Sequence, residues 1–286
     1  IRMYLDDPGW RSSANLMEAL YVRHPVRLDI AGTVASIRQI NPELLYLCHR
    51  IFYHPSNMVL FAAGDLDPRA VVDQVRAACA RRDYPVQPAI VRCLPEEPQA
   101  IAARRRVQEL VVSQPIFRLG FKEKEVGLTG RPLLERDLLT AMLLDILVGR
   151  GSPLYTRLYE SGLIDQRFGF GHAPEVTFGY TYLAGPTPDP ERLEAELLAG
   201  LAEAQAAGVD EADFERARRK LMGRLLNLMN DLEGISYLFI DGFFKDIAFF
   251  DGIPVLQSLT PDAANRRLRE HFDPALAATS IIAPRQ

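Results

Sequence analysis

Five histidines are the side chains with the greatest potential for metal or acid–base chemistry: His24, His49, His54, His172 and His271. Two imidazoles that bind zinc from one face of a helix stand about four residues apart, as in the motif H-x-x-E-H. No two of these histidines have that spacing, and the nearest pair, His49 and His54, has no Glu between its members. Their spacing puts the two rings on poorly matched helix faces, and Pro55 follows directly. A metal role for this pair is therefore disfavoured.

The remaining polar candidates have structural explanations. His24 precedes Pro25 and is expected to bond to loop backbone, while His271, near a predicted helix end, suits a partner of the helix dipole. The side chains expected to be solvated are Asp6, Asp7, Glu123, Glu125 and the run Arg104–Arg106. The sequence thus identifies no catalytic and no metal-binding residue, and it leaves the substrate-binding residues unknown.

Composition restricts the class of protein. The chain has 286 residues, 48% of them hydrophobic, which suffices for one large or two ordinary domains. A formal net charge of −4 provides no basic field for nucleic acid, and no apolar run approaches the roughly 20 residues that span a membrane. Three cysteines, Cys48, Cys79 and Cys93, are odd in number and far apart, which predicts reduced thiols and a cytoplasmic location.

Hydrophobic spacing predicts helices and one strand in the first part of the chain. Helices are expected at 10–22, from about residue 42 and from residue 68 to about 82, the last two after Asn-Pro and Asp-Pro starts. A short helix is expected to begin at Thr33 or Ser36. The near-continuous apolar run NMVLFAAG at 57–64 predicts a strand that is buried on both faces.

A proline-rich stretch divides the chain. Residues 84–106 contain four prolines, and proline removes N–H donors and fixes φ, so an extended linker is predicted there. The predicted domains are therefore 1–83 and 107–286. The second is expected to contain strands near 114–124, 178–185 and 278–283 and helices at 132–148, 152–161, 190–206, 211–228, 232–250 and 261–271.

Two segments share one plan: LFAAGDLDPRAVVDQV (60–75) and YLAGPTPDPERLEAEL (182–197). Each has an apolar strand, a Gly, an Asp-Pro helix start and a helix with aliphatic periodicity. The repetition arises either by chance, because Asp-Pro is a general helix opening, or because the chain contains two halves of related fold.

Residues 19–68 contain an ordered series of short motifs: His24-Pro25, Gly32-Thr33, Ser36-Ile37, Ile40, Tyr53-His54-Pro55, Asn57-Met58 and Gly64-Asp65. This series resembles the pitrilysin/insulinase family of zinc metallopeptidases, the inverzincins, and the opening IRMYLDDPGW is similar to the bacterial intracellular branch of that family. The resemblance implies an α/β (α+β) fold. It would comprise two related sandwich domains in a half-clamshell, each a mostly antiparallel sheet packed with helices.

Family chemistry requires zinc held by H-x-x-E-H and a downstream Glu, with the Glu of the motif deprotonating a metal-bound water. The motif is absent from these residues. The resemblance therefore implies zinc in a full-length parent, with ligands upstream of Ile1, and none in this chain. On that alignment the residue before Ile1 would be the Glu ligand, and the 286 residues alone are expected to be inactive.

The second half of such enzymes also carries an Arg and, seven positions later, a Tyr beside a Gly-Leu pair. Gly162-Leu163 matches, but Tyr159 falls near the Arg position, and Asp165 or Gln166 near the Tyr position. Within the family this lack is typical of subunits that borrow the pair from a related partner. The resemblance thus implies a peptide substrate and a heterodimer with a related subunit, or a homodimer.

Three interpretations follow. The chain is a fragment of a zinc-dependent metalloendopeptidase subunit that cleaves peptides in a closed chamber, or a non-catalytic partner subunit of an insulinase-like heterodimer, or a general two-domain α/β binding protein. No Gly-rich phosphate loop and no G-x-S-x-G elbow supports a nucleotide or ester role. Upstream sequence with or without H-x-x-E-H would separate the first two.

Overall fold

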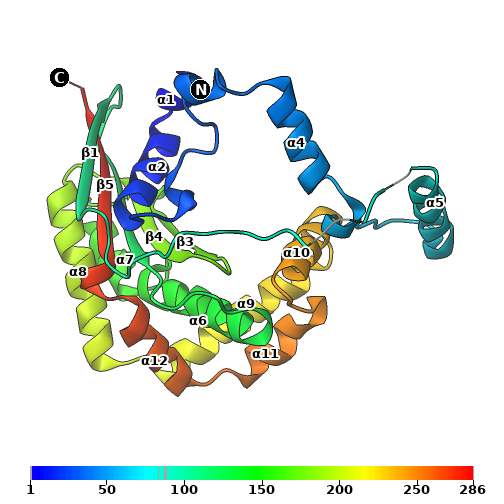
Figure 1. The fold of residues 1–286 in the computed structure, drawn as a ribbon. Helices are drawn as coiled ribbons and strands as arrows, with labels where there is room; N and C mark the ends of the chain where they lie inside the picture. The colour runs from blue at the N-terminus through cyan, green and yellow to red at the C-terminus, as the bar shows by residue number, and fades with distance from the viewer. Residues whose placement is uncertain (1, 83, 87–88, 286) are drawn as a thin grey trace.

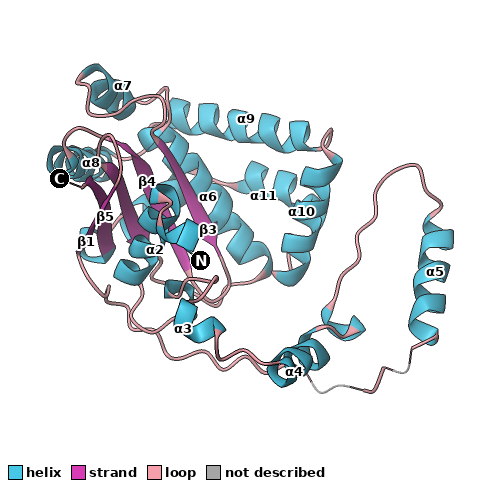
Figure 2. Ribbon diagram, turned by 90° about the horizontal axis from the view of Figure 1, so that it is seen from above, coloured by secondary structure: helices cyan, strands magenta, loops and turns pink. Residues whose placement is uncertain are grey.

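The computed structural model describes residues 2–82, 84–86 and 89–285. The second part of the chain forms a mixed sheet packed with helices, and α2 (Pro8–Leu20) lies against it (Figure 1). Two further helices, α4 (Pro42–Phe52) and α5 (Pro68–Ala80), stand apart from this body in both views (Figure 2). The fold is therefore mixed α/β, as predicted.

The sheet has five strands in the order β1-β5-β2-β4-β3. Only the β1–β5 pair is parallel among the pairings between the described strands. The middle strand, β2, pairs on both sides, so that Phe117 lies opposite Gly185 of β4 and Ile281 of β5. The strand bounds are β1 (Arg105–Leu110), β2 (Ile116–Lys122), β3 (Gly169–Pro174), β4 (Gly179–Pro186) and β5 (Ala277–Pro284).

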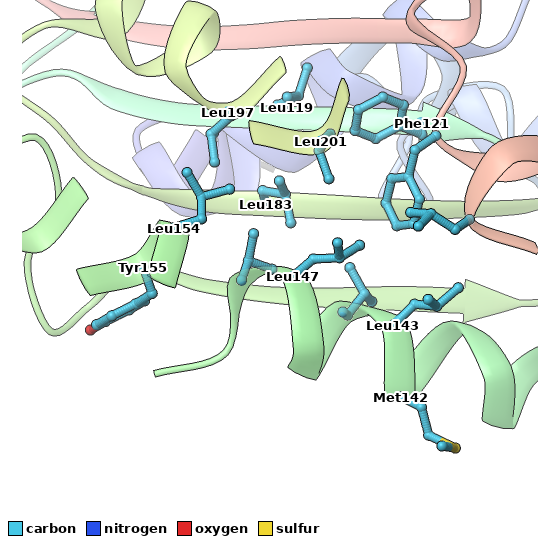
Figure 3. Close-up of a cluster of buried hydrophobic side chains, with 14 of the residues drawn as sticks. Leu119, Phe121, Met142, Leu143, Leu147, Leu154, Tyr155, Leu183, Leu197 and Leu201 are labelled. Carbon is cyan, nitrogen blue, oxygen red and sulfur yellow. The ribbon is translucent and has the colours of Figure 1, made fainter. Parts of the chain in front are cut away.

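One face of the sheet carries the main hydrophobic core. Phe117, Leu119 and Phe121 alternate along β2 and are fully buried. Figure 3 shows Leu119 and Phe121 among leucines of the covering helices. Burying each such side chain contributes roughly 1.5–3 kcal/mol before entropy is considered. The helices of this layer and its edges are α6 (Gly130–Val148), α7 (Pro153–Glu160), α8 (Pro190–Ala207), α9 (Glu211–Leu228), α10 (Leu232–Phe244), α11 (Gly252–Ser258) and α12 (Pro261–His271).

The opposite face is covered in part by α2, which packs on β5 and β2. Leu16 and Leu20 of this helix are fully buried there. Gly120 of β2 permits the close approach, since a Cβ at that position would lie 2.7 Å from Leu16 Cδ2. A helix from the first part of the chain is therefore integral to the second part.

Short elements connect these parts. The helix α1 (Arg2–Leu5) precedes α2, and α3 (Val34–Ile37) begins after Thr33, whose hydroxyl accepts from Ser36 N, so the predicted start at Thr33 is confirmed. Four 3₁₀ turns complete the described elements: η1 (Pro25–Arg27), η2 (Pro55–Asn57), η3 (Phe249–Asp251) and η4 (Pro274–Leu276).

The sequence predicted most helices well but misplaced strands. The helix starts at Pro42 and Pro68 are confirmed, and both are capped by the expected Asn41 and Asp67 side chains. The strand predicted at 57–64 is wrong, because after η2 these residues are irregular and Met58 is 58% exposed. A strand requires a neighbour to bond its backbone, and no described strand lies beside this run. β1 and β3 were not predicted.

The described helices include no single membrane-spanning candidate. No single one is long and apolar enough to cross a bilayer, and one pair bent by 42°, α6 and α7, meets the criteria of length and composition together.

Candidate functional site

The five histidines do not converge. His49 stacks on Tyr53 with ring centroids 5.1 Å apart, and His54 bonds to Ser56 of its own turn at 2.7 Å. His24 Nδ1 accepts from Val26 N at 3.1 Å, which confirms the predicted loop-backbone role. His172 on β3 bonds to Asp137 of α6, and His271, the last residue of α12, is buried.

Glu123 corrects one sequence-based expectation. Its carboxylate is buried, not solvated, and forms a two-pronged ion pair with Arg267 of α12, with Nη1 and Oε1 2.9 Å apart. Arg267 Nε also donates to Thr140 Oγ1 of α6 at 2.9 Å. This cluster joins the end of β2 to α6 and α12. Glu125, by contrast, is exposed as expected, with 70% of its side chain accessible.

The charged groups in this cluster shift one another's pKa values. Burial opposes ionisation of Glu123, but bonds and charges from His271 and Arg267 hold its pKa below the ordinary value. Burial lowers the pKa of His271 to about 4, which the neighbouring Glu123 only partly offsets. His271 Nε2 and Thr181 Oγ1 are hydrogen-bonded at 2.9 Å. At neutral pH the cluster thus contains an ionised carboxylate beside a neutral imidazole.

These residues do not fit a zinc ion. Within the residues that the structure describes, no group of three or more His, Cys, Asp and Glu side chains is arranged to hold a metal. Glu123 is engaged by Arg267, and the imidazoles of His172 and His271 bond to Asp137 and Thr181. The described residues therefore provide no zinc site.

A second charged cluster fastens α2 to the sheet. Glu97 accepts from the backbone N–H groups of Val22, Arg23 and His24 at 2.7–2.8 Å and from Lys122 Nζ at 2.6 Å. Lys122 also donates to the carbonyls of residues 98 and 100. Burial would raise the pKa of Glu97, but the bonds from Lys122 and the three N–H groups lower it to about 2. Residues of the predicted linker thus tie the end of α2 to the middle strand.

The arginine run Arg104–Arg106 is exposed, as expected, but Arg105 and Arg106 do not belong to a linker. Arg105 and Arg106 begin β1, and Arg105 pairs with Glu191 and Glu194 of α8. Arg106 lies 3.6 Å from Glu18 of α2. The sheet therefore begins with β1 at Arg105, before the end of the predicted linker.

Beside α2, the same face of the sheet carries an arginine and a row of aromatic side chains, all of them partly buried. Phe178, Tyr180 and Tyr182 form a row of ring contacts beside α2, with centroids 6.3–6.5 Å apart. Arg118 of β2 lies with its guanidinium carbon 4.6 Å from the centre of the Tyr182 ring, and Nε donates to Ser12 Oγ at 3.4 Å. Burial lowers the pKa of Arg118. We call Arg118, Phe178, Tyr180 and Tyr182 the arginine–aromatic surface.

The positions that match the family's Arg and Tyr do not form a site together. Tyr159 ends up stacked on Tyr155 of the same helix, and Asp165 bonds to Arg167. Gly162 has a φ of +71°, the conformation that glycine adopts most readily, and Leu163 is buried.

Sequence reasoning missed Arg118, Lys122 and their surroundings. One signal was available, because in β2 the positions 118, 120 and 122 alternate with the apolar 117, 119 and 121. That alternation places Arg118 and Lys122 on one face of the sheet. Their different partners could not be deduced, because Ser12 and Glu97 approach from distant segments.

Comparison with known proteins identifies the family. Residues 39–221 match the family described as Peptidase M16 inactive domain. The chain belongs to the M16 peptidase family. Over 272 residues it is 37% identical to a protein of Bacillus subtilis (strain 168) named uncharacterized zinc protease YmfH, a match that covers 95% of this chain and 63% of YmfH.

Two further relatives support this assignment. A crystal structure described as that of an M16-like peptidase from Alicyclobacillus acidocaldarius superposes with a TM-score of 0.95 at 38% identity, covering all of this chain and 68% of that one. The alpha subunit of mitochondrial-processing peptidase from Pongo abelii is 26% identical over 258 residues, which cover 82% of this chain and 47% of that subunit. The chain therefore spans between about half and two thirds of the length of its curated relatives.

Proposed function

We propose that this M16 chain is the non-catalytic portion of a zinc-dependent metalloendopeptidase subunit. One observation carries the proposal: the chain is 37% identical to a zinc protease over most of its length, yet its sequence contains no H-x-x-E-H. The match to the family's inactive domain supports the same assignment. The zinc and its ligands belong to the catalytic portion, and this chain has neither catalytic nor metal-binding residues.

In this proposal the chain forms one wall of a closed chamber in which peptides are cleaved. Residues 1–83 belong to a first peptidase-like domain. The interdomain linker, predicted at 84–106, ends at residue 104 because β1 begins at Arg105, and the chain from there to residue 286 forms the second domain. The apolar faces of α4 and α5 support this division, since Leu45 is 60% and Val72 is 45% exposed without a sheet beneath them. The partly open sheet face beside α2 provides a surface on which a peptide can lie.

An alternative is a non-catalytic partner subunit of a heterodimer. The similarity to a protein named as the alpha subunit of a processing peptidase favours this second candidate. In either case the partner is a related M16 subunit or a second copy. The three cysteines, none of them in a disulfide, fit the cytoplasmic location that we propose.

A reconstitution experiment tests the proposal and separates its alternatives. The 286-residue chain is assayed with zinc and a quenched fluorescent peptide, alone and together with a related M16 chain that contains H-x-x-E-H. We expect no cleavage by the chain alone and increased cleavage in the mixture, abolished when the Glu of the partner's motif is changed to Gln. Zinc-dependent cleavage by the lone chain would contradict the proposal. Stable association without increased cleavage would favour the partner-subunit alternative.

A further inference from the structure

Two cations point from the middle strand toward the same face of the sheet, but their surroundings differ. Lys122 is almost fully buried and has a carboxylate and two carbonyls as partners. Arg118, four residues earlier, has no carboxylate within ion-pair distance among the residues that the structure describes. It bonds to Ser12 Oγ and to the side chain of Tyr182, over whose ring the guanidinium lies.

An unpaired guanidinium on a central strand is energetically unfavourable unless something compensates it. Removing a cation from water costs free energy that a long hydrogen bond and a ring face recover only in part. The protein nevertheless holds the guanidinium in place. The hydroxyl of Ser12, a fully buried residue of α2, accepts a hydrogen bond from Arg118 Nε, and the ring of Tyr182 on β4 packs against the guanidinium. Besides Nε, the guanidinium has a hydrogen bond to the Tyr182 side chain, and no described carboxylate pairs with it, so terminal N–H donors remain available.

Guanidinium geometry selects the anion that fits. A planar fork of parallel N–H donors matches a carboxylate in a two-pronged bond, which is stronger than a bond between neutral groups. The neighbouring rings of Phe178, Tyr180 and Tyr182 pack against the α2 cluster but are only partly buried, and their accessible parts suit the apolar side chains of a peptide better than a highly charged polymer. The net charge of −4 also argues against a polyanion.

We propose that the arginine–aromatic surface binds an extended peptide and that Arg118 recognises an Asp or Glu side chain within it. This inference rests on the proposed function, because it takes the ligand to be the peptide of an M16 peptidase. Arg118 lies at the middle strand, beside the row of rings, so a chain that follows the row passes it with a side chain and not with its terminus. Arg118 is thus a specificity-determining residue and not a catalytic one.

Fluorescence anisotropy of labelled short peptides tests this assignment on the full 286-residue chain. Three peptides share an apolar and aromatic sequence: one has a central Glu and an amidated C-terminus, one has Gln and an amidated C-terminus, and one has Gln and a free C-terminus. We expect the Glu peptide to bind about tenfold more tightly than the amidated Gln peptide, the ratio that one charge-assisted bond provides. The preference should weaken as salt is added.

Three variants test whether Arg118 causes the preference for the Glu peptide. Arg118→Gln should abolish the preference for the Glu peptide, Arg118→Lys should retain part of it, and Arg224→Gln, which removes an exposed arginine of α9, should leave it unchanged. Thermal unfolding confirms that each variant is folded, and the comparison of peptides on the wild-type chain does not depend on any variant.

Each remaining outcome has a defined meaning. Equal binding of the Glu and amidated Gln peptides by the wild-type chain would overturn the role of Arg118 while leaving the proposed function intact. A preference for the free C-terminus alone would overturn the assignment to a side chain. Binding of none of the three peptides would overturn the inference together with its premise of a peptide-binding wall.

Discussion

Lys122 Nζ and Glu97 Oε1 lie 2.6 Å apart where the middle strand, the end of α2 and the predicted linker meet. The pair is well shielded, with 4% and 15% of the two side chains exposed. Glu97 also accepts from three successive backbone N–H groups that follow α2. One carboxylate therefore satisfies four donors and fixes the position of α2 on the sheet.

Replacing Glu97 by Gln should destabilise the fold strongly. The change leaves the Lys122 ammonium buried without its counter-charge, and breaking such a pair from one side costs about 3–5 kcal/mol. Urea unfolding followed by circular dichroism measures the loss. Glu96→Gln is the matched control, because Glu96 is exposed and adjacent in sequence. Equal unfolding midpoints for the two variants would show that the cluster does not hold α2 in place.

The protein should lose stability in two steps as the pH falls. The pKa of His271 is lowered from 6.5 to about 4 in the folded state, so the unfolded chain gains its proton first and stability declines between those values. The pKa of Glu97 is lowered from 4.5 to about 2, so its contribution is complete above pH 4.5 and is lost toward pH 2.

Urea midpoints across this range separate the two steps. His271→Gln should flatten the decline between pH 6.5 and 4 while leaving the lower step in place. Glu97→Gln should reduce the lower step, to which Glu123 with its lowered pKa still contributes, and leave the upper decline in place. The charged groups that face His271 are Glu123, Arg267 and His172, and they are unchanged in both variants. An undiminished decline in the His271 variant would show that another group controls it.

Helices could be predicted from sequence because their determinants are local. The cap residues Asn41 and Asp67 and the proline after each are adjacent in the chain, and so is the apolar stripe of α6. These features act without knowledge of any distant partner. The same holds for β4, whose aromatic alternation marks it as a strand, and for β5, a short run that is buried along most of its length.

The features that could not be predicted from the sequence depend on contacts between distant segments. β1 contains Arg105, Arg106 and Glu109 and lacks an apolar pattern, because it is an edge strand whose charges pair with α8 and α2. From the sequence alone, Glu123 is predicted to be a surface residue. In the fold it pairs with Arg267, which is far from it along the chain. The run at 57–64 has the composition of a buried strand but no neighbouring strand to join. Local propensity cannot supply such partners.

The Glu123–Arg267 pair should show strong coupling. Arg267→Met leaves a buried carboxylate and Glu123→Gln leaves a buried guanidinium, so each should cost about 3–5 kcal/mol. The double variant should cost less than the sum, because neither charge is then left unpaired. A double-mutant cycle by urea unfolding measures this. The exposed pair Arg131–Glu135 is the control and should contribute at most about 1 kcal/mol. Additive losses at Glu123 and Arg267 would contradict a direct interaction.

A substitution at Gly120 tests whether α2 is part of the folded core. An alanine Cβ would lie 2.7 Å from Leu16 Cδ2, so Gly120→Ala should push α2 off the sheet or force Leu16 from its rotamer, at a cost of about 1–3 kcal/mol. The matched control is Gly223→Ala in α9, where the added Cβ meets nothing within 4 Å, and it should stabilise the protein by about 0.5–1 kcal/mol.

Leu16→Ala completes the test of this contact. Alone it should cost about 2–5 kcal/mol, because it leaves a cavity beneath α2. Combined with Gly120→Ala it should cost less than the sum, since the new methyl group then occupies space that Leu16 has vacated. Chemical denaturation of the four proteins measures the coupling. If Gly120→Ala and Gly223→Ala behaved alike, α2 would not be packed against the middle strand in solution, and the residues before the linker would have to be treated as independent of the sheet.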